Sequence, residues 1–102
     1  MIKHLKFATA SPGTTLIEQG ERRGRSVSVF FILRGCVVVE RDDNPVGQLS
    51  DGAYFGEMSV LLPERKAVAS VTTIENCEFA TLDGVQYIKL LRAYPQVQGE
   101  VT

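Results

Sequence analysis

The feature that most limits the possible folds is a series of short β-type runs between Thr14 and Leu82. Each run is rich in β-branched or aromatic residues and is bounded by residues that favour turns. Short strands at regular spacing predict a sandwich or a small barrel, in which closure protects the strand edges. We therefore expect a mainly β protein, an antiparallel β-barrel or jelly roll of the double-stranded β-helix type, over about residues 14–82. The runs are TTLIEQG (14–20), SVSVFFILRG (26–35), CVVVE (36–40), VGQLSDG (46–52), VASVTT (68–73) and CEFATLD (77–83).

Local turn signals suggest how neighbouring runs connect. The run 36–40 leads into the turn cluster Asp42-Asp43-Asn44-Pro45 and returns as the run 46–52. The last two runs, 68–73 and 77–83, are expected to pair with each other across residues 74–76. The first residues of the chain suit a helical turn or an extended lead-in.

Short helices are expected to flank the strands. The run MSVLL after Glu57 is long enough for about one helical turn before Pro63. Asp83 is a candidate cap for a helix over about residues 84–94, and Pro95 is consistent with its end. Its apolar stripe comprises Val85, Ile88 and Leu91, with Tyr87 and Tyr94 as further candidates.

Length, charge and residue types exclude several classes of function. The 102 residues suit one domain, 1–102, and the 11 basic and 12 acidic side chains give a net charge of −1. No positive excess favours nucleic-acid binding, and the apolar runs are too short for membrane insertion. Two cysteines and one histidine do not suggest a zinc site or a disulfide framework. A small metal-dependent β-barrel enzyme of the cupin type lacks the histidines that its metal would require.

One stretch of the sequence carries polar groups suited to a sugar-phosphate. Gly56 permits a close backbone approach, and a helix starting at Glu57 would direct the free amides of Met58 and Ser59 outward, toward a phosphate. The Glu57 carboxylate can accept hydrogen bonds from two vicinal sugar hydroxyls, and the pair at 65–66 supplies positive charge. The alternative is a surface turn in which Glu57 caps the helix and Arg65 and Lys66 are solvated. Spacing alone leaves both interpretations open.

Four blocks in order make the chain similar to a family. It resembles the cyclic nucleotide-binding domains of catabolite activator proteins, cAMP-dependent kinase regulatory subunits and cyclic nucleotide-gated channels. In that family the blocks are an opening strand, paired central strands with a glycine between them, a phosphate-binding cassette, and closing strands with a hinge helix. The third block is most like that of hyperpolarisation-activated channels. The blocks are PGTTLIEQGE (12–21), VFFILRGCVVVE (29–40), LSDGAYFGEMSVL (49–61) and ASVTTIENCEFATLDGVQYIKLLRAYP (69–95).

The resemblance assigns roles to the cassette that begins at Phe55. Glu57 matches the family glutamate that binds the ribose 2′-hydroxyl, and the backbone of Gly56, Met58 and Ser59 matches the lining of the phosphate site. The family then expects an arginine on the phosphate, followed by a small residue or a threonine.

This chain departs from the family pattern at the arginine. Counting back from Pro95 places Ala67 in the arginine position and Val68 after it, whereas counting forward from Glu57 places Arg65 or Lys66 there. One residue is therefore inserted between the two blocks. Loss of a charge-assisted phosphate contact of about 1.5–3 kcal/mol predicts weak binding. Val68 replaces the threonine that favours cGMP in channels, so guanine selectivity is not expected.

The resemblance implies a regulatory module and not an enzyme. Its ligand would be cAMP or cGMP, with no cofactor and no metal, and its output an effector or channel domain elsewhere in a longer protein. We expect the family's further helix, which covers the base, to be absent or truncated here. We expect a cytoplasmic location, including the cytosolic part of a membrane protein. The alternative is a domain of the same fold that binds no nucleotide and acts as a structural or protein-interaction module.

Overall fold

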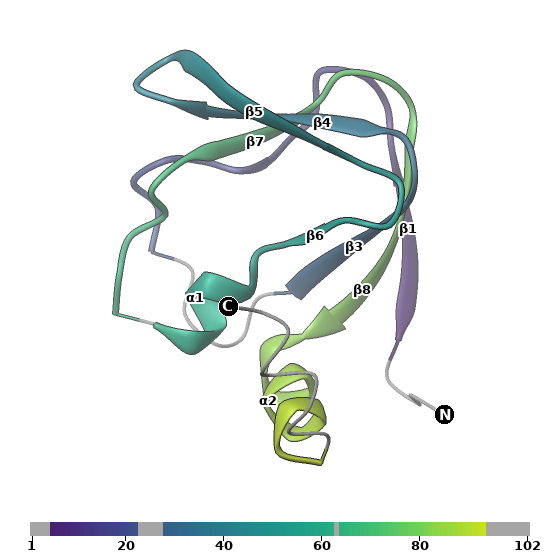
Figure 1. Ribbon diagram of the computed structural model, residues 1–102, viewed down its shortest axis with the longest axis vertical. Helices are drawn as coiled ribbons and strands as arrows, with labels where there is room; N and C mark the ends of the chain where they lie inside the picture. Colours follow the sequence, from purple (N-terminus) through teal and green to yellow (C-terminus); the bar gives the residue numbers. More distant parts are fainter. Residues whose placement is uncertain (1–4, 23–27, 63, 94–102) are drawn as a thin grey trace.

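Two antiparallel sheets form the body of the protein. The computed structural model describes residues 5–22, 28–62 and 64–93. Within them, two four-stranded sheets have the strand orders β1-β8-β3-β6 and β2-β7-β4-β5, as Figure 1 shows. The expected antiparallel β-barrel or jelly roll is confirmed. The elements are β1 (Lys6–Ala10), β2 (Thr15–Ile17), β3 (Ser28–Arg34), β4 (Cys36–Arg41), β5 (Asn44–Ser50), β6 (Tyr54–Phe55), α1 (Glu57–Leu61), β7 (Ser70–Thr73), β8 (Cys77–Asp83) and α2 (Gly84–Ala93).

The connection between β4 and β5 follows the prediction, because these strands form a hairpin. Asp42 and Asp43 adopt positive φ values of 53° and 65° at its tip. Aspartate tolerates this left-handed region better than most residues, which explains why the acidic turn cluster falls here. The same hairpin begins its return strand at Asn44, two residues earlier than the apolar pattern suggested.

The expected pairing of the last two strands is wrong. β7 pairs with β2 and β4, whereas β8 pairs with β1 and β3 in the other sheet. Likewise β3 and β4, the central strands of the second matching block, belong to different sheets. The chain crosses between the sheets at each of these connections, so strands adjacent in sequence become neighbours across the core.

The two crossings lie against each other at Gly35. The amide of Ile74 donates to the Cys36 carbonyl at 3.0 Å, which joins the second crossing to the first. Gly35 has φ 118°, and a Cβ there would lie 2.6 Å from the Cys77 Sγ and 2.8 Å from the Asn76 carbonyl oxygen. Only glycine combines this conformation with so close an approach of two backbone segments.

The ends of the chain depart from expectation in two details. β1 pairs along its length with β8, so the sheet begins before residue 14, and the extended lead-in is a true strand. Helix α2 begins where predicted, and the Asp83 Oδ1 accepts from the Gln86 amide at 2.9 Å. Val85 does not join the apolar stripe, because it is 51% exposed while Tyr87 and Leu91 are buried. Tyr94 and Pro95 lie outside the described residues.

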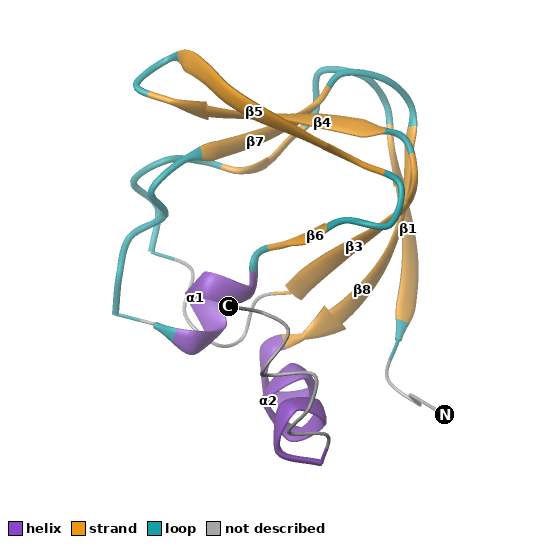
Figure 2. Cartoon of the chain, in the orientation of Figure 1, coloured by secondary structure: helices purple, strands orange, loops and turns teal. Residues whose placement is uncertain are grey.

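The apolar core has two parts. One lies between the two sheets, where the Phe55 ring stacks on Phe30 with centroids 5.0 Å apart and meets the Phe79 ring edge-on. The other lies where α1 and α2 cover the open end of the β-structure, and it contains Val60 and Leu82 (Figure 2). The described residues contain no helix that is both long and apolar enough to span a membrane.

Candidate functional site

A cavity of about 270 Å³ opens beside α1. Its apolar floor is formed by one side chain from each strand of the sheet β2-β7-β4-β5. Residues 54–59 and 67–69 form its other walls. Ile17 and Val71 of this floor are also part of the core, so the floor is held by packing. The cavity therefore offers apolar surface on one side and the polar start of a helix on the other. The floor residues are Ile17, Val39, Leu49 and Val71.

Gly56 sets the direction of the chain at the polar wall. It has φ 95° and ψ −5° and immediately precedes α1, a helix of five residues. This left-handed conformation suits glycine, and it lets the strand β6 turn directly into the helix. Glu57 is thereby placed at the first position of the helix, beside the cavity. No side chain caps the helix, so the alternative role of Glu57 as a helix cap is not observed.

The Glu57 carboxylate has an unused acceptor. Its Oε2 atom is shielded from solvent and accepts no hydrogen bond from any residue that the structure describes. A buried carboxylate oxygen without a donor is costly, so native proteins rarely keep one without a reason. Glu57 itself lines the cavity, and a ligand hydroxyl there reaches this oxygen when the side chain turns toward it.

Two tyrosines lie close to this carboxylate. Burial, with smaller contributions from the neighbouring Tyr54 and Glu57, raises the pKa of Tyr87 to about 12 from an ordinary value of 10.0. The Tyr54 pKa is raised as well, first by burial and then by Glu57. Tyr87 is only 3% exposed, and its hydroxyl has no hydrogen-bond partner among the described residues. Helix α2 thus presents a second unsatisfied polar atom to the region around Glu57.

We expect Tyr87→Phe to stabilise the fold by about 1 kcal/mol, because the variant removes a buried hydroxyl that has no partner and keeps the ring. Urea denaturation measures this as a higher midpoint with an unchanged slope. The effect should grow above pH 10. There the unfolded chain releases its phenolic proton while the folded chain holds it until about pH 12, so the parent loses stability between about pH 10 and pH 12 and the variant does not.

The matched control is Tyr54→Phe, since Tyr54 is only partly buried and its hydroxyl is not among the buried unsatisfied atoms. This variant should change the midpoint little. A lower midpoint for Tyr87→Phe would mean that the Tyr87 hydroxyl stabilises the folded state through a partner, contrary to our interpretation.

Ala67 faces the cavity, whereas the two cations before it do not. Its amide donates to the Glu21 carbonyl and its carbonyl accepts from the Gly20 amide, both at 2.8 Å. These bonds fix the segment against the chain that follows β2. Ala67 is half-buried and packs against the core between the sheets.

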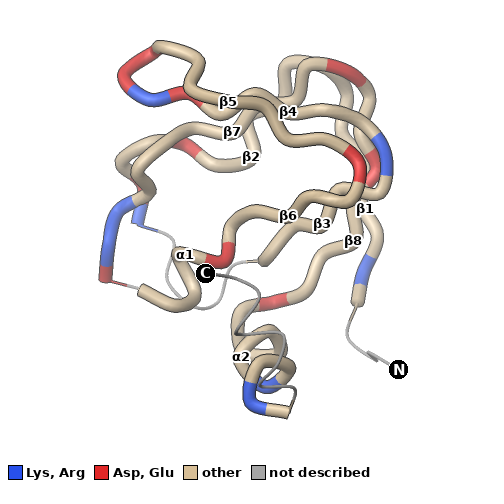
Figure 3. The backbone as a smooth tube through the Cα atoms, in the orientation of Figure 1, with Lys and Arg blue, Asp and Glu red and all other residues tan. Residues whose placement is uncertain are grey.

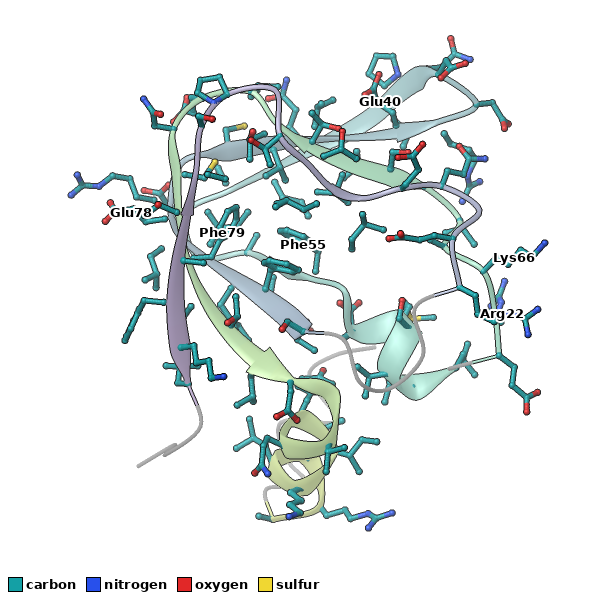
Figure 4. All side chains as sticks on the ribbon, turned by 180° about the vertical axis from the view of Figure 1, so that it is seen from behind. Arg22, Glu40, Phe55, Lys66, Glu78 and Phe79 are labelled. Carbon is teal, nitrogen blue, oxygen red and sulfur yellow. The ribbon has the colours of Figure 1, made fainter. Side chains whose placement is uncertain are left out.

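Arg65 and Lys66 are exposed and do not line this cavity. The backbones of Lys66 and Arg22 form an isolated antiparallel β-bridge, and Figure 4 shows both side chains directed outward.

The remaining predicted site residues divide between the cavity and the core. Met58, Ser59 and Val68 line the cavity, with Val68 51% exposed at its rim. Phe55 also lines it, but its ring is only 6% exposed and its main contacts are with the other aromatic rings.

Arg41, at the end of β4, is not among the site residues predicted from the sequence. It lines a second cavity of about 180 Å³ together with Arg65 and Lys66. The alternation of strand residues contained the signal, because Arg41 follows Val39 by two positions and so shares its face. Tyr87 was considered only as part of the apolar stripe of its helix.

Comparison with known sequences places the chain among ligand-binding domains. The model of the cyclic nucleotide-binding domain family matches residues 8–94. The potassium/sodium hyperpolarization-activated cyclic nucleotide-gated channel 2 of Mus musculus is 33% identical over 98 residues, which cover 96% of this chain and 11% of the channel. The corresponding channel 4 of Oryctolagus cuniculus is 31% identical, with 96% of this chain and 8% of the channel covered. The chain therefore spans only about a tenth of the length of these relatives.

Solved structures agree on the fold. The chain superimposes with a TM-score of 0.81 on a structure described as Sp-2Cl-cAMPS bound to PKAR CBD2, at 24% identity over 95% of this chain and 64% of the other. A cAMP-bound PfPKA-R structure gives a TM-score of 0.78 at 23% identity, over 96% of this chain and 37% of the other.

Proposed function

The chain belongs to the cyclic nucleotide-binding domain family, and from this we propose that it is a regulatory module that binds cAMP weakly and controls an output domain elsewhere. The observation that carries the proposal is Glu57, which lines a cavity of about 270 Å³ and whose buried Oε2 atom has no donor among the described residues. The 2′-hydroxyl of a ribose is the donor that the family assigns to this glutamate.

The shape and chemistry of the cavity support a nucleotide. The apolar floor suits a base or sugar face, which is only weakly hydrated, and a site of this kind needs few polar groups to fix orientation. Gly56, Met58 and Ser59 contribute backbone to the opposite wall, where the family places the cyclic phosphate. We propose that Phe55 supports this wall through its packing in the core, and that Val68, at the rim, lies next to the nucleobase.

Weak binding and a preference for cAMP follow from two residues. Ala67 stands where we place the family arginine, so a bidentate contact with the phosphate is missing. Val68 has no hydroxyl with which to bind a guanine amino group, so cGMP gains no contact that cAMP lacks.

We propose no catalytic role, no cofactor and no metal for the site. Among the described residues, no group of three or more metal-binding side chains occurs.

We propose that the output lies in a larger protein, because the channel relatives are about ten times longer than this chain. An effector or channel domain is the expected partner, in the cytoplasm or on the cytosolic side of a membrane.

The second candidate function is a non-sensing structural or interaction module of the same fold. The observation that favours it is Ala67, because a pocket without its arginine has lost the main electrostatic contact with a phosphate.

Calorimetric titration of the 102-residue chain with cAMP, cGMP and 5′-AMP tests the proposal. We expect saturable binding of cAMP, no tighter binding of cGMP, and weaker binding of 5′-AMP, which has the same base and sugar but no cyclic phosphate. Tighter binding of cGMP would contradict the role given to Val68. Equal binding of cAMP and 5′-AMP would show that the pocket does not read the cyclic phosphate. Absence of binding by all three would favour the non-sensing module.

A further inference from the structure

The second cavity lies directly beside the proposed nucleotide cavity. The two share Met58, Ser59, Ala67 and Val68, so one wall separates them. This wall is where the family places the cyclic phosphate. The second cavity, of about 180 Å³, is also lined by Arg41, Leu62, Arg65 and Lys66. Three cationic side chains therefore surround it.

The three cations come from two segments far apart in the sequence. Arg41 ends β4, while Arg65 and Lys66 belong to the connection between α1 and β7. Figure 3 shows positive charge on this connection and on the β4–β5 hairpin, on the same side of the molecule. The Arg41 Nε donates to the Val68 carbonyl at 3.3 Å, which ties its guanidinium to the shared wall. Arginine has further N–H donors, and these remain available to an anion.

Acidic residues flank Arg41 and Arg65 in the sequence, but no acidic residue lines this cavity. Among the described residues, Arg41, Arg65 and Lys66 form no ion pair with a carboxylate. Asp42, next to Arg41, bonds through its Oδ1 to the Gln19 amide group at 3.0 Å, and neither it nor Glu64 lines the cavity. Like charges around one small cavity repel each other, and an anion between them would remove that cost.

We propose that this cavity is an anion subsite in which Arg41, helped by Arg65 and Lys66, takes the charge of the phosphate that the missing cassette arginine would otherwise bind. The inference rests on the proposed function and extends it, because the phosphate charge is then recognised by a residue of β4 outside the cassette. The base and sugar lie in the nucleotide cavity, and the phosphate reaches the cations at the residues that the two cavities share. The same chemistry admits free inorganic phosphate, which should compete for this subsite.

The test is calorimetric titration of cAMP into the parent chain, Arg41→Ala, Arg41→Lys and Arg92→Ala. We expect Arg41→Ala to weaken binding about tenfold and to reduce its salt dependence, since a charge-assisted contact is lost. Arg41→Lys should fall between, because lysine keeps the charge without the planar fork. Arg92→Ala removes an equal charge from the last turn of α2, distant in sequence from the cavity, and should bind like the parent. Far-UV circular dichroism and the thermal midpoint show whether each variant is folded.

Two further measurements separate this inference from the proposed function. Inorganic phosphate should raise the thermal midpoint of the parent and of Arg92→Ala, but not of Arg41→Ala. The double variant Arg41→Ala/Ala67→Arg should regain cAMP binding, because an arginine in the cassette makes the subsite dispensable. If Arg41→Ala binds cAMP and phosphate as Arg92→Ala does, the subsite is refuted while the nucleotide cavity stands. If no variant binds cAMP but phosphate still stabilises the parent through Arg41, the subsite stands and the proposed function fails. If neither ligand acts on any variant, both are wrong.

Discussion

Replacing Glu57 by alanine is expected to lower the affinity for cAMP about a hundredfold, which corresponds to about 2.7 kcal/mol. A hydrogen bond to a charged acceptor contributes about 1.5–3 kcal/mol, and the buried Oε2 atom has no other donor among the described residues. Folding should be unaffected or slightly improved, because the side chain neither caps its helix nor pairs with a cation in the described part of the chain. Calorimetry with cAMP and urea denaturation measure the two effects separately.

Two variants serve as controls for this substitution. Glu57→Gln keeps the shape but replaces the charged acceptor by an amide, and it should lose most of the affinity. Glu64→Ala removes an exposed acid from the loop after α1 that does not line the proposed nucleotide cavity, so its effect on affinity should be small. Unfolding of Glu57→Ala together with unchanged affinity in the folded fraction would show that the glutamate is structural, and our site would be wrong.

Introducing an arginine at Ala67 is expected to tighten cAMP binding by about ten- to a hundredfold. Ala67 lines both cavities and its backbone is fixed by two hydrogen bonds, so a longer side chain would begin at the wall where the phosphate is proposed to lie. A guanidinium there can bind two phosphate oxygens at once. In the absence of ligand the variant should have a lower thermal midpoint, because it adds a fourth cation next to Arg41, Arg65 and Lys66.

The control for size is Ala67→Leu, which fills the same space without charge and should not tighten binding. Arg65→Ala and Lys66→Ala test the other alignment, in which one of these residues takes the place of the cassette arginine. A large loss of affinity in either variant, with no gain in Ala67→Arg, would favour that alignment. No binding by the parent and none by Ala67→Arg would identify the chain as a non-sensing module.

Much of the fold was readable from local sequence. β-Branched and aromatic runs predicted β3, β4 and β8 to within about two residues at each end, since a strand that packs one face on a core requires such side chains. Asp83 predicted the start of α2, because its carboxylate accepts from a free amide of the first turn. The sequence Phe55-Gly56-Glu57 likewise predicted a turn into a short helix, since the positive φ of Gly56 is open mainly to glycine.

Sheet membership was not readable in the same way. An alternating run shows that a strand has a buried face, but it does not say which other strand completes its hydrogen bonds. β7 and β8 are adjacent in sequence, yet Gly35 and the turn at 74–76 let the chain pass from one sheet to the other at both crossings. Val85 shows the same limit within a helix, because the buried stripe depends on which face α2 turns toward the strands.

Local sequence patterns alone indicate a small antiparallel β-structure with Glu57 at the start of a helix, because strand patterns, glycine turns and caps depend on neighbouring residues. The three-dimensional arrangement was needed to show that Ala67, and not Arg65 or Lys66, faces the cavity, since a shift of one residue turns a side chain to the opposite face. It also brought Arg41 beside these cations across more than twenty residues of chain. Long-range pairing of β4 with β7 produced that contact, and no local pattern encodes the partner of a strand.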